Sequence, residues 1–173
     1  MSDCFAHQLR LDQIRDGDRL ELAADDAERA AIARRLGLQS LGRLTAHVTL
    51  ARTGDVVRAE GRLTAALDQS CVVTGEPVAA HIDEPFAIQF TPGPKVGGPD
   101  EEIELNEADC DTVFHDGAVI HLGDALADTL ALSLDPYPRS AGADAVIREA
   151  GIISEEQASP FAVLAKLRRN DET

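Results

Sequence analysis

Aromatic residues are scarce in this sequence, and tryptophan is absent. One Tyr and five Phe make up the whole aromatic set of the 173-residue chain, so we expect a core built mainly of aliphatic side chains. Proteins that read single-stranded RNA stack bases on aromatic faces beside basic grooves. The sequence has neither ingredient in quantity, which argues against this class of binding surface.

Cysteine and long apolar runs are also in short supply. The three cysteines, Cys4, Cys71 and Cys110, are odd in number and scattered, which fits a reducing compartment better than a disulfide framework. No apolar run approaches the roughly 20 residues of a membrane span, and Met1–Arg10 lacks the basic start and apolar core of a secretory signal. We therefore expect a cytoplasmic protein that does not cross a membrane.

Recognisable catalytic and metal-binding motifs are missing as well. Cys110 and His115 are close in sequence, but a closed zinc site needs four ligands and the partners are absent. Cys71 has no G-x-S-x-G elbow or evident base beside it, and we expect it to be a small residue near a turn. The adjacent acids Asp83 and Glu84 are expected to be solvated. The sequence thus predicts no enzyme, no metal site and no cofactor.

Negative charge is the strongest global signal. The formal net charge is −15, and the segment from Asp100 to Asp135 holds 11 acids and no Lys or Arg. Such a field repels phosphate backbones and attracts basic proteins. Acidity that only keeps the chain soluble is the simpler interpretation.

The first half of the sequence predicts a sheet and one helix. Residues 5–22 are expected to be a strand or an extended lead-in, and Asp25 with Glu28 forms a capping-box pattern for a helix that ends at Gly37. Alternating apolar residues on either side of the turn-forming segment 52–55 then predict a long hairpin. A third strand follows, with Val78, Ala80, Ile82, Phe86, Ile88 and Phe90 on one side and Pro85 marking an edge or a bulge.

The second half of the sequence predicts shorter elements separated by loops. Residues 91–100 (TPGPKVGGPD) are expected to be a flexible loop, and residues 140–159 a loosely ordered stretch. Between them we expect short strands at 103–105, 113–114 and 119–122, a hairpin turn at Asp116-Gly117, and a helix over 124–133. The sum is one α+β domain over 1–173, with an antiparallel sheet that can curl toward a barrel, helices packed on it and a short C-terminal helix from Pro160.

Three sequence motifs resemble those of the YceD family, the large ribosomal RNA subunit accumulation proteins. The stretch Cys71 to Val78 (CVVTGEPV) is similar to the family's C-x-x-C-x-x-P signature in its alphaproteobacterial form, with Cys71 and Pro77 as motif residues. The stretch Asp128 to Arg139 (DTLALSLDPYPR) resembles the family's helix and proline turn at Pro138, and Pro160-Phe161 its closing N-P-F pattern. The resemblance spans about residues 5–170.

The resemblance implies a non-catalytic factor that supports accumulation of 23S ribosomal RNA and biogenesis of the large ribosomal subunit. Some members have paired cysteines and a later Cys or His that could hold zinc. Here Thr74 replaces the second Cys, Gly75 the usual Leu, and Arg139-Ser140 a His-containing segment. The resemblance therefore carries no metal role over to this chain.

We expect the partner to be a basic ribosomal protein or assembly factor docked by the acidic segment 100–135. The candidate partner-binding residues are Tyr137, Pro138 and Arg139 in the proline turn, and Phe161, Leu164 and Leu167 on one face of the tail helix. The prolines can also serve only to stop a helix, and the tail helix can simply pack on the sheet.

Two alternatives remain open at the level of the sequence. The chain could be a metal-dependent hydrolase that processes ribosomal RNA with its carboxylates, or an acidic mimic of a nucleic acid. The sequence leaves the identity of the partner, the step of assembly, direct contact with RNA and the oligomeric state undetermined.

Overall fold

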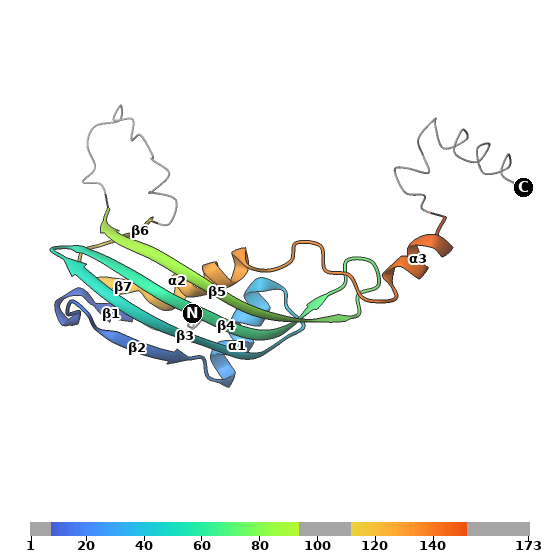
Figure 1. Cartoon of the computed structure of the whole chain (residues 1–173), viewed down its shortest axis with the longest axis horizontal. Coiled ribbons are helices and arrows are strands. Elements are labelled where there is room, and N and C mark those ends of the chain that lie inside the picture. Colours follow the sequence, from blue (N-terminus) through green and yellow to red (C-terminus); the bar gives the residue numbers. More distant parts are fainter. Residues whose placement is uncertain (1–7, 94–111, 152–173) are drawn as a thin grey trace, which may run out of the picture. The chain divides into compact units, whose positions relative to one another are not determined.

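The computed structural model describes residues 8–93 and 112–151 (Figure 1). These residues form two compact units. The first holds the chain up to Gln69 and the stretch from Ala79 to Pro136, and the second joins Ser70–Val78 to the chain from Tyr137 onward. No helix in the described part of the chain is long and apolar enough to cross a membrane.

The first unit is built around a five-stranded sheet with the order β2-β3-β4-β5-β6. Its strands are β2 (Arg19–Ala23), β3 (Ser40–Thr53), β4 (Val56–Ser70), β5 (Pro77–Pro92) and β6 (Thr112–His115). The β2–β3 and β3–β4 pairs are antiparallel, whereas β5 and β6 run parallel. A second, two-stranded sheet pairs β1 (Gln8–Arg10) with β7 (Val119–His121), and a 3-10 turn at Leu11–Gln13 follows β1. The α+β fold predicted from the sequence is confirmed, and the described strands close no barrel.

Local signals place the first helix and the long hairpin where the sequence predicts them. Helix α1 (Asp26–Leu36) has Asp25 as its N-cap, and the reciprocal bonds with Glu28 complete a capping box. Gly37 ends the helix with φ +66°, a left-handed conformation that glycine adopts without a steric cost. The β3–β4 hairpin turns at Gly54, and Leu44 pairs with Ala65 along the buried face.

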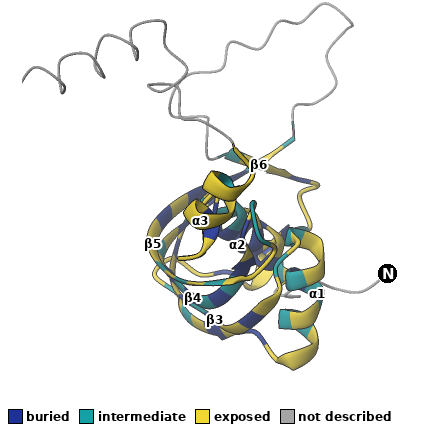
Figure 2. Cartoon of the chain, turned by 90° about the vertical axis from the view of Figure 1, so that its right-hand side faces the viewer, coloured by how far each residue is buried: buried dark blue, intermediate teal, exposed yellow. Residues whose placement is uncertain are grey.

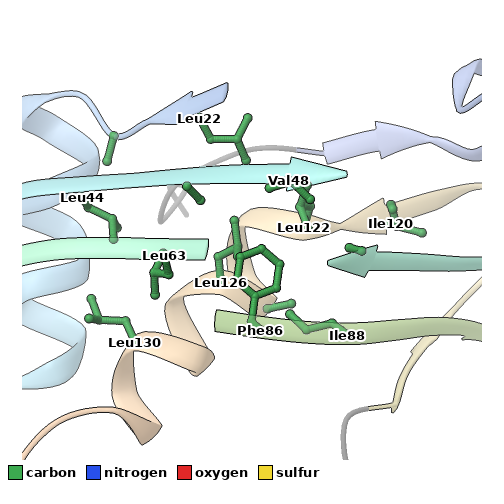
Figure 3. Close-up of a cluster of buried hydrophobic side chains, with 14 of the residues drawn as sticks. Leu22, Leu44, Val48, Leu63, Phe86, Ile88, Ile120, Leu122, Leu126 and Leu130 are labelled. Carbon is green, nitrogen blue, oxygen red and sulfur yellow. The ribbon is translucent and has the colours of Figure 1, made fainter. Parts of the chain in front are cut away.

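The core lies between the sheet and helix α2 (Leu122–Leu132). Leu126 and Leu130 of α2 point toward Leu63 and Phe86 of the sheet in Figure 3. Buried and exposed residues alternate along β3, β4 and β5 in Figure 2, because successive side chains of a strand point to opposite faces. Among the described residues, the buried hydrophobic side chains are aliphatic apart from Cys71, Phe86 and Phe90, as the scarcity of aromatics predicts.

Three expectations for the second half of the chain are corrected. The Asp116-Gly117 turn exists, but β6 and β7 on either side of it belong to different sheets, so it closes no hairpin. Helix α2 begins at Leu122, two residues before the predicted start, because Leu122 itself is buried in the core. Helix α3 (Ala143–Glu149) occupies part of the stretch predicted to be loosely ordered, and the buried Ala143 anchors its start.

Candidate functional site

The second unit brings two of the sequence motifs together. The turn after β4 carries Cys71, and the proline turn after α2 carries Pro138. The backbone N–H of Val72 donates to the carbonyl oxygen of Pro138 at 2.9 Å. The backbone N–H of Ser140 donates to the sulfur of Cys71 at 3.2 Å. Residues almost 70 positions apart in the sequence are therefore neighbours in space.

The Cys71 turn is closed by its own backbone. The N–H of Cys71 donates to the carbonyl oxygen of Glu76, and the N–H of Gly75 donates back to the carbonyl oxygen of Cys71, at 2.8 and 2.9 Å. Gly75 has φ +73°, a conformation that a residue with a Cβ rarely adopts. This requirement explains a glycine at the position where the resemblance has Leu.

The sulfur of Cys71 is an acceptor for several donors. The N–H of Thr74 donates to it at 3.4 Å, in addition to the N–H of Ser140. Burial raises the pKa of the Cys71 thiol, but the hydrogen bonds from Thr74 and Ser140 outweigh burial and lower the pKa to about 6. These hydrogen bonds therefore favour the thiolate form of Cys71. The side chain is only 3% exposed, so the thiolate anchors two segments of chain and does not face a substrate.

Thr74 and Ser140 complete this cluster. Their hydroxyl oxygens lie 3.1 Å apart, and Thr74 also donates to the carboxylate of Glu76 at 3.1 Å. A zinc site would need four thiolate, imidazole or carboxylate ligands around one point. One sulfur and two hydroxyls do not fit that set, and the described residues contain no group of three or more His, Cys, Asp or Glu in reach of one ion. The metal role that the resemblance suggests for other members does not fit here.

The surface of the second unit exposes candidate partner-binding residues. Tyr137 is 73% exposed and Val72 is 54% exposed, and the Val72–Pro138 hydrogen bond sets them on adjacent segments. The Arg139 side chain is 59% exposed and lies 3.9 Å from a carboxylate oxygen of Asp144. Pro138 itself is buried, so it supports this surface without forming it. Val72 is not among the candidates predicted from the sequence, although an apolar residue next to turn-forming residues was a signal for it.

The remaining candidates lie elsewhere. Asp128 of the second motif lies on α2 in the first unit, where its carboxylate pairs with Arg35 of α1 at 2.5 Å. Pro160, Phe161, Leu164 and Leu167 lie outside the described residues, as does the start of the acidic segment up to residue 111.

The described acids of segment 100–135 are largely engaged within the chain. Arg35 lies 4.0 Å from Asp124 as well as contacting Asp128. The carboxylate of Asp116 accepts from the backbone N–H groups of Ala118 and Val119, and these bonds lower its pKa. The segment has no Lys or Arg of its own, yet α1 supplies an Arg from far away in the sequence. This part of the acidic segment is therefore less free to dock a partner than its composition suggests.

A shallow cleft of about 570 Å³ in the first unit has two Arg and two Asp among its lining residues. Both cations are already bound. Arg52 donates from Nη1 to the carbonyl oxygens of Leu11 and Ile14, and Arg10 pairs with Asp12 at 3.0 Å. The cleft thus holds parts of the fold together and offers no unpaired cation to a ligand.

The comparisons identify the family. The family model for YceD, large ribosomal RNA subunit accumulation protein, matches residues 59–168, which include Ser70–Val78 and most of the chain from Tyr137 onward. No curated protein and no solved structure matches the chain. Because the matched region covers more than half of the sequence and contains the joined motifs, the chain belongs to the YceD family of large ribosomal RNA subunit accumulation proteins.

Proposed function

We propose that this protein supports accumulation of 23S ribosomal RNA as a binding factor and not as a catalyst, by docking a basic ribosomal protein or assembly factor. The observation that carries the proposal is the junction of the Cys71 turn with the proline turn. The buried sulfur of Cys71 and the hydrogen bonds around it hold the two motifs of a ribosomal RNA accumulation family against each other, next to the exposed side chains of Val72, Tyr137 and Arg139.

The chemistry of this surface supports binding. Tyr and Arg are enriched among residues that dominate interface energetics, since each combines apolar area with directional hydrogen bonding. A turn held by five hydrogen bonds from backbone N–H groups presents these side chains with little loss of freedom on association. The net charge of −15 favours encounter with a basic partner over an acidic one. Such a factor acts where ribosomes are assembled, in the bacterial cytoplasm.

Complementation tests the surface. In cells that lack the protein, Tyr137→Ala and Arg139→Ala should restore 23S ribosomal RNA relative to 16S less well than the wild type, with unchanged melting temperatures of the purified proteins. Val146→Ala, at an exposed apolar side chain of the same unit, is the matched control and should restore the ratio. If both Tyr137→Ala and Arg139→Ala restore the ratio fully, this surface is not needed for accumulation of 23S ribosomal RNA.

Further experiments separate binding from the other classes of function and test the tail. Capture of basic partners should weaken as the salt concentration rises, because the encounter is electrostatic. Pure protein incubated with precursor ribosomal RNA and Mg²⁺ should leave the RNA intact, whereas cleavage would point to a processing hydrolase. Competition with RNA for a basic site would point to a mimic of a nucleic acid.

Deletion of residues 160–173 tests the tail: lost complementation at unchanged stability supports docking by Phe161, Leu164 and Leu167.

A further inference from the structure

The outer edge of β5 is open over most of its length. β4 lies on one side of β5, and β6 covers the other side only from Gln89 to Pro92. Over residues 79–88 no strand of the described chain lies beside this edge, and no described loop makes a backbone hydrogen bond to it. Alternate N–H and C=O groups along these residues therefore point outward without a backbone partner from the described chain. A row of such groups is a template for a further strand.

The core-facing side of β5 is incompletely covered along the same stretch. Side chains at even positions share one face of the strand. Phe86 and Ile88 on this face are buried, but Ala80 and Ile82 are only half-buried although they pack against the core. Because neighbouring strands cover each other's side chains on the same face, an added strand would complete the burial of Ala80 and Ile82.

Glu84 interrupts this apolar row. By alternation it belongs to the same face as Ile82 and Phe86, yet it is exposed. The adjacent Asp83 lies 2.7 Å from Arg62 of β4, whereas the described residues give Glu84 no ion pair within 4.0 Å. The open edge therefore carries an exposed carboxylate between two apolar positions, and its attraction to Arg62 is weaker than that of Asp83.

We propose that residues 79–88 of β5 bind an extended, basic polypeptide segment of a partner protein by strand addition. The partner places a Lys or Arg beside Glu84 and apolar residues beside Ile82 and Phe86. This inference rests on the proposed function, which requires a basic protein partner, and it adds the surface and the pattern that the partner presents. Polypeptide is favoured over RNA because the edge offers backbone donors and acceptors in strand spacing, and because its carboxylates repel phosphate.

The same features oppose pairing between two copies of this chain. Pro85 lacks an N–H group, and a second copy that aligned on the edge in parallel would set Glu84 beside Glu84. A basic segment replaces that repulsion with attraction. Charge on the edge thus selects a partner and discourages self-association.

Amide hydrogen exchange on the full chain tests the binding mode. The probe is a short synthetic peptide with the core Val-Thr-Lys-Thr-Val, and the matched control has Glu in place of Lys. We expect the Lys peptide to slow exchange at alternate amides of residues 79–88 and the Glu peptide to leave exchange unchanged. Equal effects of the two peptides, no protection of residues 79–88, or protection of the same amides by single-stranded RNA would overturn the proposal.

A pair of charge reversals tests Glu84 directly. Glu84→Lys should weaken binding of the Lys peptide about fivefold, and Glu21→Lys on β2, at the opposite edge of the sheet, should not change it. Both side chains are exposed, so the melting temperatures should stay the same. If Glu84→Lys binds the Lys peptide with unchanged affinity, the edge of β5 is not the binding surface. The proposed function is tested separately by the ratio of 23S to 16S ribosomal RNA, which can fall in cells lacking the protein whether or not strand addition occurs.

Discussion

The backbone N–H of Ser140 lies 3.2 Å from the sulfur of Cys71 and donates to it. This contact joins the motif after β4 to the motif after α2, and it makes the cysteine an acceptor instead of a reactive group. In this chain the cysteine of the first motif thus shapes a surface through the hydrogen bonds that its sulfur accepts.

The Cys71 thiolate should make stability depend on pH. Its pKa is lowered to about 6 in the folded protein, whereas an unfolded thiol titrates at about 8.5. The unfolded chain therefore binds more protons between these values, so the thiolate's contribution to stability rises with pH, is complete above the unfolded pKa, and is lost as pH falls through about 6. Melting temperatures measured from pH 5 to pH 9 should show this rise in the wild type and lose it in Cys71→Ser. An identical pH dependence in both proteins would contradict the anchor.

Thr74 should control that pKa. Burial raises the pKa of the thiol, and the side-chain hydrogen bond of Thr74 is the largest of the interactions that lower it. Thr74→Val should therefore raise the pKa of Cys71 from about 6 toward its ordinary value. The measurement is the ultraviolet absorbance of the thiolate during a pH titration, in a background where Cys4 and Cys110 are replaced by Ser. Thr64→Val, at a hydroxyl that bonds to Thr45 within the sheet, is the matched control and should leave the titration unchanged.

Gly61 should be intolerant of any side chain. A Cβ at this position would lie 1.8 Å from the carbonyl oxygen of His47 on β3 and 3.1 Å from the ring of Phe86. Gly61→Ala must therefore push β3 and β4 apart, and we expect a loss of about 3 kcal/mol or more in the free energy of unfolding. At Gly42 a Cβ would meet only the Ala66 carbonyl oxygen at 3.6 Å. Gly42→Ala should change stability by less than about 1 kcal/mol in urea unfolding.

His115 should act as a structural link. Its Nε2 lies 2.8 Å from the carbonyl oxygen of Asp55 at the tip of the β3–β4 hairpin, and its Nδ1 accepts from the N–H of Gly117 at 2.9 Å. Because the side chain is buried, His115→Ala leaves both backbone groups short of a partner and should cost about 1–3 kcal/mol of unfolding free energy. His47→Ala removes an exposed imidazole of the same sheet and should cost less than about 0.5 kcal/mol. Equal losses in urea unfolding would refute the link.

Features set by neighbouring residues could be predicted from the sequence, and features set by distant ones could not. The capping box at Asp25 and Glu28 and the hairpin turn at Gly54 depend on a few adjacent side chains, and both predictions are confirmed. The separate sheets of β6 and β7 depend on which distant strand each short segment meets, namely β5 and β1. The motif residues Cys71 and Pro138 were found, but their contact through Ser140 needs the fold itself.

The pairing of Arg35 with Asp128 leads to the last prediction. The two side chains are 41% and 62% exposed, so solvent screens the pair and Arg35→Ala should lower the free energy of unfolding by less than about 1 kcal/mol. The substitution also frees Asp124 and Asp128 from their cation, so a basic partner that docks on the acidic segment should bind more tightly and with a steeper dependence on salt. Arg34→Ala makes the same change in net charge one residue away, and no ion pair to Arg34 is found in the described chain. Equal gains in affinity for the two variants, measured by titration calorimetry at two salt concentrations, would show that net charge alone attracts the partner and that these two carboxylates form no docking face.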